Sequence, residues 1–397
     1  MKRTLKLHFI VLFVVLLTLA RPTKSNGQCV IWLSTTNQQA KPSSVSSNLS
    51  NNSTINQILT SYGTTKYQQA FRNSVRACAV NEFIILANGN GDSLKKKLVE
   101  TNLFDTVIFL NKGNLHLACS SPVTVNDPLI LTWDNWAMNM IEANCAWSIT
   151  KGDDRVTIGI SDSEFDDGHE DLVGKFTKVW HSIPGYTGPI EYHGTKVASV
   201  AIAATNNNIG ITSIGYNTKA GGYAIDDIIS PREGILEAYN DGHKIINVSW
   251  YDDGITKSEA EELTQHGVVL CYAAGNDPSI ISHSAIANVP GVIVTSGVNK
   301  DNKHGPTNTS RNVWVDLCAP SEPVLRAHSR TDPRGFPYYS YSGGGSTSTA
   351  SPIVAGTVAL MRSVNPCLSP REVEYILKQT SDPIDDNSSF PGLVGAG

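Results

Sequence analysis

The chain has little net charge, and it lacks the features that would tie it to a nucleic acid or a membrane. Its 397 residues carry 31 Lys and Arg against 36 Asp and Glu, so the net charge is −5, and no long run of like charge occurs. This composition offers no basic surface for a nucleic-acid partner. Beyond residue 27, no segment has the length and purity of a transmembrane helix, so we expect no membrane span in the mature protein.

The spacings between the cysteines match no zinc-binding pattern. There are seven of them, an odd number, so at least one stays unpaired and the connectivity of any disulfides is open. Cys271 and Cys318 lie in apolar, strand-like runs, and we expect them to be small core residues rather than reactive thiols.

The first 27 residues have the build of a signal peptide. Three basic residues precede the apolar stretch Phe9–Ala20, and the polar stretch Arg21–Gly27 follows it. Cleavage after Ala20 or after Gly27 would fit this pattern. A membrane anchor is the alternative, but the apolar stretch is too short to span a bilayer comfortably. We therefore expect a secreted or extracytoplasmic protein.

Residues 28–124 form a region of their own. Thr36 to about Ser61 is rich in Ser, Asn, Thr and Gln, which predicts a loop or linker. A strand over Glu82–Ala87, a helix over Asp92–Thr101 and a strand over Thr106–Leu110 then predict a small α/β unit. Either an inhibitory propeptide or a stabilising subdomain would have this form, and both interpretations stay open.

From residue 125 to residue 397, predicted strands and helices alternate. This alternation predicts an α/β fold with a doubly wound, mainly parallel sheet and helices on both faces. The strands are expected at Val156–Ile160, Gly221–Ile225, Lys244–Val248, Val268–Tyr272, Gly291–Ser296 and Trp314–Cys318. The helices are expected at Trp133–Trp147, His193–Ala204, Pro231–Asn240, Lys257–His266 and Ala350–Ser363.

Three residues at the boundaries of these elements predict nucleophilic catalysis. Asp162 follows a strand, His193 begins a helix, and Ser348 precedes a helix whose Pro352 is tolerated in a first turn. Ser348 would attack a carbonyl carbon, His193 would take its proton, and Asp162 would hold the imidazole in the correct tautomer. The order Asp, His, Ser along the chain is the subtilisin order.

A fourth residue would stabilise the oxyanion. Asn276 follows a buried strand in Ala273-Ala-Gly-Asn276 and can supply a side-chain amide donor, with the Ser348 backbone N–H as a second donor.

These segments resemble the subtilisin-like serine proteases, the subtilase family, from about Val125 to the last residue. The motifs are Ile160–Leu172, His193–Ala198, Ala274–Asn276 and Thr347–Gly356. The resemblance implies a secreted serine endopeptidase that acts on protein or peptide substrates, with Ser249 and its neighbours bordering the substrate cleft. His169 also matches the first motif, but we expect it to be structural rather than catalytic, because the mechanism needs one base and His193 is better placed. No cofactor is needed for the chemistry. Structural calcium is an open alternative, for which Asp153-Asp154 and Asp166-Asp167 could supply carboxylates, but no ligands are assigned.

The chain departs from the family pattern near the site. Glu164 stands where Gly is usual, which would cost energy if that position needs a positive φ, and its carboxylate would tend to raise the imidazole pKa. Ser346 also replaces a usual Gly, and Trp250 and Tyr251 put two aromatic side chains beside the cleft. These departures motivate the alternative function, a pseudoprotease that serves as an exported binding or adhesive module. Oligomeric state and any further C-terminal domain are not fixed by the sequence.

Overall fold

The structure, a computed structural model, describes residues 29–43, 48–69, 82–88, 90–110, 122–132, 135–180, 192–225, 230–250, 253–277, 283–304, 309–331, 337–385 and 387–396. The chain divides into two compact units, Met1–Ser120 and Ser121–Gly397, close to the boundary expected at residues 124–125. The predicted signal peptide lies outside the described residues. Within the described residues, no helix is long and apolar enough to cross a bilayer.

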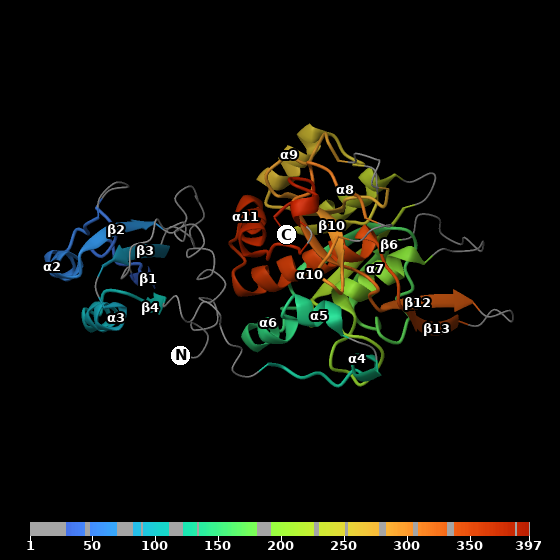
Figure 1. Ribbon diagram of the computed structural model, residues 1–397, viewed down its shortest axis with the longest axis horizontal. Coiled ribbons are helices and arrows are strands. Elements are labelled where there is room, and N and C mark those ends of the chain that lie inside the picture. The colour runs from blue at the N-terminus through green and yellow to red at the C-terminus, as the bar shows by residue number, and fades with distance from the viewer. Residues whose placement is uncertain are drawn as a thin grey trace. The chain divides into compact units, whose positions relative to one another are not determined.

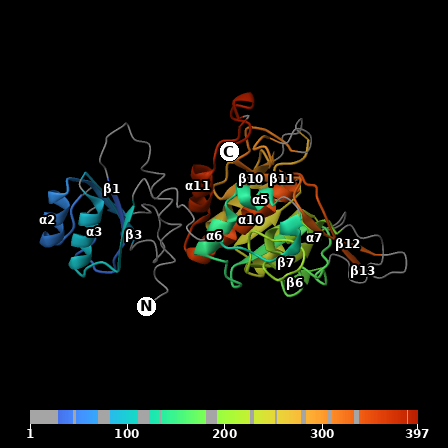
Figure 2. The same cartoon turned by 60° about the horizontal axis from the view of Figure 1, so that its bottom comes forward.

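The N-terminal unit is an antiparallel sheet with two helices. Its elements are β1 (Cys29–Ser34), α2 (Ser53–Ser61), β2 (Thr64–Gln69), β3 (Glu82–Ala87), α3 (Gly91–Glu100) and β4 (Thr106–Leu110). The sheet order is β2-β3-β1-β4, and the strands that pair run antiparallel. The βαββαβ order along the chain is that of a ferredoxin-like unit. Figure 2 shows α2 and α3 beside each other against this sheet.

Helix α2 corrects the prediction of a linker up to about Ser61. The Asn52 side chain caps the helix by accepting a hydrogen bond from Ile55 N at 3.1 Å. Ile55 and Leu59, one turn apart, are fully buried in the core of this unit. Ile58 packs partly buried on the same core, and the polar composition of the segment concealed these few apolar residues.

The C-terminal unit is built around a seven-stranded sheet in the order β11-β10-β9-β8-β5-β7-β6. All of its strand pairs are parallel, which confirms the predicted doubly wound α/β fold. Its strands are β5 (Thr157–Asp162), β6 (Phe176–Trp180), β7 (Lys219–Ala224), β8 (Ile245–Val248), β9 (Val269–Ala273), β10 (Val292–Asn299) and β11 (Leu317–Glu322). A separate hairpin pairs β12 (Arg326–Thr331) with β13 (Pro337–Ser342).

Helices pack on both faces of this sheet (Figure 1). The helices of this unit are α4 (Pro128–Thr132), α5 (Trp136–Met140), α6 (Ala143–Ile149), α7 (His193–Ile202), α8 (Pro231–Asn240), α9 (Lys257–Gln265), α10 (Thr347–Val364) and α11 (Pro370–Thr380), with a short 3-10 turn at Asn387–Ser389. Of these, α7, α8 and α10 make the largest contacts with the sheet. In β5, Ser161 Oγ donates to Pro231 O of α8 at 3.4 Å. The next residue, Asp162, therefore faces the other side, where α7 and α10 pack.

Three predicted elements differ in their bounds. The helix expected at Trp133–Trp147 is broken into α5 and α6, because Glu142 takes a left-handed conformation with φ of 52°. Strand β11 begins at Leu317 and continues past the predicted end at Cys318. Helix α10 begins at Thr347, so Ser348 lies inside its first turn and Pro352 lies further into the helix than predicted. The Ser346 side chain caps this earlier start.

Candidate active site

The site lies where the strand order of the sheet reverses. Strand β5 is flanked by β7 on one side and β8 on the other, and its carboxyl end is therefore at a topological switch point. Asp162 ends β5, Ser249 directly follows β8, and Asn276 follows β9. The fold thus brings three strand ends together with the first turns of α7 and α10.

Asp162 is fully buried, and its Oδ1 atom accepts two hydrogen bonds. One comes from His193 Nδ1 at 2.7 Å and the other from the backbone N–H of Ser163 at 2.8 Å. A carboxylate only accepts, so the proton of the neutral imidazole lies on Nδ1. His193 Nε2 is then the acceptor that this ring can present to a substrate-side group.

His193 is held in place by the start of α7. Its backbone N–H donates to Ser163 Oγ at 3.1 Å. The following residue must be glycine, because a Cβ at Gly194 would overlap the Ser163 carbonyl oxygen. The pKa of His193 is raised above its usual value, mainly by the negative charge of Asp162, while burial and the positive charge of Lys196 oppose this rise.

Ser348 shares a cavity with His193. The cavity has a volume of about 230 Å³, and its walls are Ser163, His193, Ser249, Trp250, Ala273, Gly275, Asn276, Thr347 and Ser348. The Ser348 hydroxyl donates to the Ser249 carbonyl at 3.4 Å, and not to His193. The Ser348 backbone N–H points to Ser346 Oγ at 3.4 Å, a long hydrogen bond. Nucleophile and base candidates therefore face one cavity without a direct hydrogen bond between them.

Asn276 is oriented by Thr347. Asn276 Oδ1 accepts from the Thr347 backbone N–H at 3.2 Å and from its hydroxyl at 2.8 Å. Both of these contacts use the carbonyl oxygen of the side chain. The Nδ2 group, which can only donate, is therefore left to serve a ligand in the cavity.

The structure places two of the three expected substrate-binding residues. Ser249 and Trp250 line the cavity, Ser249 buried and Trp250 half-buried. Tyr251 lies outside the described residues. Position 345 in the loop before Ser346 requires glycine, because a Cβ there would overlap the Ser321 carbonyl oxygen.

The departure at Glu164 costs no backbone strain. Glu164 is not among the residues with positive φ, so a side chain is tolerated there. The pKa of His193 is raised, but by the charge and hydrogen bond of Asp162, and Glu164 is not among the groups that shift it.

His169 lies outside the cavity wall, as its structural interpretation requires. It is fully buried, and its ring packs on Tyr339 and Tyr341 with centroid distances of 4.8 and 5.4 Å. Burial lowers the pKa of His169, which favours its neutral form.

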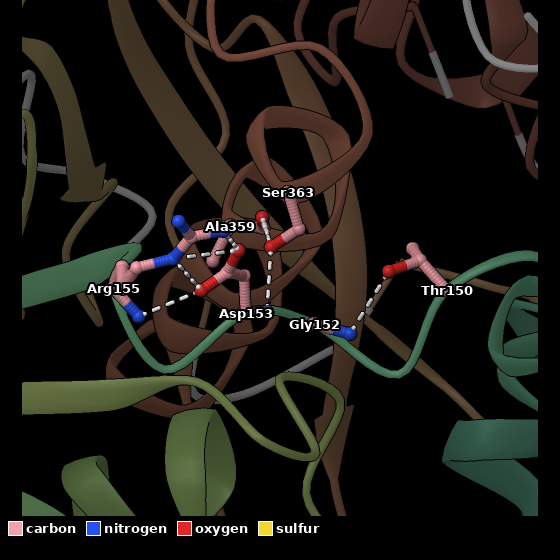
Figure 3. Close-up of polar contacts among 6 residues, drawn as sticks. All are labelled: Thr150, Gly152, Asp153, Arg155, Ala359 and Ser363. Carbon is pink, nitrogen blue, oxygen red and sulfur yellow. Dashed lines mark hydrogen bonds and ion pairs between the residues drawn. The ribbon is translucent and has the colours of Figure 1, made fainter. Parts of the chain in front are cut away.

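Both acidic pairs make contacts with groups of the protein. The Asp153 carboxylate is paired with the Arg155 guanidinium (Figure 3), and Asp166 Oδ1 accepts from Gly168 N at 3.0 Å. Among the described residues, no group of three His, Cys, Asp or Glu side chains could hold a metal. Structural calcium thus stays a prediction without assigned ligands.

The cysteines agree with the expectation where they are described. Cys271 is a fully buried free thiol in β9, and burial raises its pKa to about 12. Cys318 is half-buried in β11, and Cys367 is part of a disulfide. None of these residues lines the cavity.

Two residues that hold the site together were given no role by the sequence. Ser163 contacts both Asp162 and His193, and Thr347 orients Asn276. Each is the immediate neighbour of a candidate catalytic residue, and that adjacency is the signal that could have found them.

Comparison with known proteins decides the family. Residues 153–397 match the Subtilase family. The chain belongs to this family. As a subtilase it is a hydrolase of the serine-peptidase class. It is 30% identical over 324 residues to the "Thermophilic serine proteinase" of Bacillus sp. (strain AK1), which covers 78% of this chain and 75% of that protein.

Other relatives match shorter parts of this subtilase. Subtilisin E of Bacillus subtilis (strain 168) is 31% identical over 245 residues, covering 57% of this chain and 60% of that protein. The "Extracellular protease" of Xanthomonas campestris pv. campestris is 31% identical over 228 residues, covering 52% of this chain and 38% of that protein. A solved protease from Pseudoalteromonas arctica has the same fold, with a TM-score of 0.53 at 22% identity over 70% of this chain and 96% of that one.

Proposed function

We propose that the protein is a secreted serine endopeptidase that uses Ser348 as nucleophile, His193 as general base and acid, and Asp162 to orient His193. One observation carries this proposal. Within one cavity, the imidazole that Asp162 fixes through Nδ1 leaves Nε2 available beside Ser348 and Asn276.

The reaction would begin with rotation of the Ser348 hydroxyl away from the Ser249 carbonyl. Hydroxyls rotate easily, and a hydrogen bond of 3.4 Å offers little resistance. Ser348 Oγ then attacks the peptide carbonyl carbon while His193 Nε2 takes the hydroxyl proton. The proton passes to the leaving amine as the C–N bond breaks, which leaves an acyl-enzyme on Ser348. Water then attacks the acyl carbon while His193 Nε2 takes a proton from it, and the proton passes to Ser348 Oγ as the acyl bond breaks.

Asn276 would stabilise the oxyanion of each tetrahedral intermediate. Its Nδ2 group is fixed before the reaction because Thr347 holds Oδ1, and a preoriented donor needs no reorganisation when charge develops. The Ser348 backbone N–H would be the second donor, released from its long contact with Ser346 Oγ.

Substrate would bind as an extended segment beside Ser249 and Trp250, pairing with the edge of the chain there. Tyr251 is proposed as a further wall of the cleft. Export is supported by the basic and apolar N-terminal pattern and by the printed name of the Xanthomonas relative.

The test is peptide hydrolysis by purified protein and two variants. Ser348→Ala should reduce turnover by about 10⁶, and Asn276→Ala should reduce kcat by about 10²–10³ with little change in KM; both factors are known from subtilisins themselves and are carried over to this chain. Equal activity of parent and Ser348→Ala would reject the proposal. A folded parent without activity would favour the pseudoprotease.

For the N-terminal unit, the propeptide hypothesis predicts a self-made cut between about Leu110 and Val125. Ser348→Ala should prevent this cut, which mass spectrometry of the exported protein would show. A mature parent protein that keeps Cys78 and Cys119 uncut would favour the stabilising subdomain.

A further inference from the structure

A proline in α10 leaves the nucleophile residue without a normal helical partner. Pro352 has no N–H, so it cannot donate to the carbonyl of the residue four positions earlier, which is Ser348. The hydroxyl of Ser249, from the end of β8, donates to this carbonyl at 3.3 Å. In return, the Ser348 hydroxyl donates to the Ser249 carbonyl at 3.4 Å.

The Ser249 hydroxyl is itself held by two buried side chains. Asn247 Nδ2 donates to Ser249 Oγ at 3.0 Å, and Ser351 Oγ donates to Asn247 Oδ1 at 2.8 Å. Asn247 and Ser351 are fully buried, and Ser249 is 4% exposed. The three hydrogen bonds run in one direction, from Ser351 in α10 through Asn247 and Ser249 back to the Ser348 carbonyl, with donor and acceptor matched at each step.

We propose that Asn247, Ser249 and Ser351, here named the β8–α10 bridge, are positioning residues for the nucleophile. The inference rests on the proposed function of Ser348. The bridge fixes the first turn of α10 to β8 where the helix lacks a backbone hydrogen bond, and so it sets where Ser348 Oγ lies relative to His193 and Asn276.

The location of Asn247 and Ser351 separates positioning from substrate contact. Asn247 and Ser351 are not part of the cavity wall, so a substitution at either one can affect the reaction only through Ser249 and Ser348. A displacement of a reacting group by about 1 Å can cost a factor of about 10² in rate, so loss of one link can be measured in kcat.

Helix α10 also supplies a matched control. Ser363 Oγ donates to Ala359 O at 2.7 Å and accepts from the Asp153 backbone N–H at 2.9 Å (Figure 3). Replacing Ser363 with Ala removes hydroxyl hydrogen bonds from the same helix, but it removes none that leads to Ser348.

The experiment compares Ser351→Ala with Ser363→Ala in the full-length protein. The readouts are kcat and KM for a peptide, the second-order rate of Ser348 labelling by a fluorophosphonate, and the thermal midpoint. Ser351→Ala should lower kcat and the labelling rate about 10-fold, with KM within about twofold. Ser363→Ala should leave kcat, KM and the labelling rate within about twofold of the parent, even if its thermal midpoint falls as much as that of Ser351→Ala.

Equal kinetics in the two variants, or a change confined to KM in Ser351→Ala, would overturn the inference. Should Ser351→Ala not fold, Ser351→Cys keeps the size and supplies a weak donor, and it should lose part of kcat; full activity there would also overturn it. A folded parent that neither cleaves nor labels would instead refute the proposed function.

Discussion

Two His–Asp pairs among the described residues have the same Nδ1–Oδ1 distance and different surroundings. His193 Nδ1 lies 2.7 Å from Asp162 Oδ1, and His283 Nδ1 lies 2.7 Å from Asp253 Oδ1. The imidazole of His193 is 23% exposed, whereas that of His283 is 0% exposed. The exposure of the carboxylates is in the opposite order: the Asp162 side chain is 0% exposed and that of Asp253 is 21% exposed.

The second ring nitrogen separates the pairs. His283 Nε2 lies 2.8 Å from the Ala273 carbonyl oxygen, so both of its ring nitrogens face oxygen atoms of the protein. His283 therefore links the segment after β8 to the end of β9, and both of its ring nitrogens are occupied by protein oxygens. His193 leaves Nε2 to the cavity that Ser348 lines. A His–Asp pair becomes a base only when its second nitrogen faces a nucleophile.

The largest expected difference is in turnover when each carboxylate is replaced. Asp162→Asn should lower kcat by about 10⁴, the size known for this change in serine proteases, because the amide favours the wrong imidazole tautomer. Asp253→Asn should leave kcat within about 10-fold, because Asp253 contacts no residue of the catalytic set. Steady-state hydrolysis of one peptide measures both, and similar losses in the two variants would remove the distinction between the pairs.

The stability ranking should be the opposite. His283→Ala leaves Asp253 and the buried Ala273 carbonyl without their partner and opens a cavity, so we expect a loss of about 2–5 kcal/mol in the free energy of unfolding. His193→Ala also removes a partner of the buried Asp162, but the Ser163 N–H still donates to that carboxylate and the imidazole borders the cavity, so we expect a smaller loss of about 1 kcal/mol. Urea unfolding, followed by protein fluorescence, measures the free energy of unfolding of both variants. A larger loss for His193→Ala than for His283→Ala would contradict this ranking.

The pH dependence of activity should follow His193. The Asp162 charge raises the pKa of His193 above its usual 6.5, and only the unprotonated Nε2 can take a proton. Activity should therefore fall as the pH falls through a midpoint above 6.5. The contribution of this pair to stability has the opposite sense: it is present below the unfolded pKa and is lost as the pH rises through the folded pKa. A kcat/KM profile with its acid midpoint below 6.5 would contradict this.

The smallest expected effect concerns Lys196. Its positive charge lowers the pKa of His193, against the effect of Asp162. Lys196→Met should therefore raise the acid midpoint of kcat/KM at low ionic strength, and added salt should shrink the difference. A lower acid midpoint in Lys196→Met than in the parent would contradict the conclusion that the Lys196 charge lowers the pKa of His193.

The sequence predicted the parallel sheet and the places of Asp162, His193, Ser348 and Asn276 because each depends on local information. β-branched runs define the strands, and every one of these residues lies at the end of such a run or at the start of a helix. The prediction of a loop failed at α2, where three apolar residues, Ile55, Ile58 and Leu59, dock a helix on the core of the unit.

Long-range polar contacts were beyond the sequence. His283 and Asp253 are separated by 30 residues and lie in no recognisable motif, so their pairing follows only from the way β8 and β9 end side by side. The bond from Ser249 to the Ser348 carbonyl spans 99 residues. Its origin, the missing N–H of Pro352, was visible in the sequence, but the partner that replaces it was not.

The most direct test of the account is fluorophosphonate labelling of the folded parent, His193→Ala and His283→Gln, with the labelled residue mapped by mass spectrometry. The account predicts that Ser348 is labelled in the parent, that His193→Ala loses the label, and that folded His283→Gln keeps it. Labelling that survives in His193→Ala, or that disappears in folded His283→Gln, would contradict the assignment of the catalytic pair.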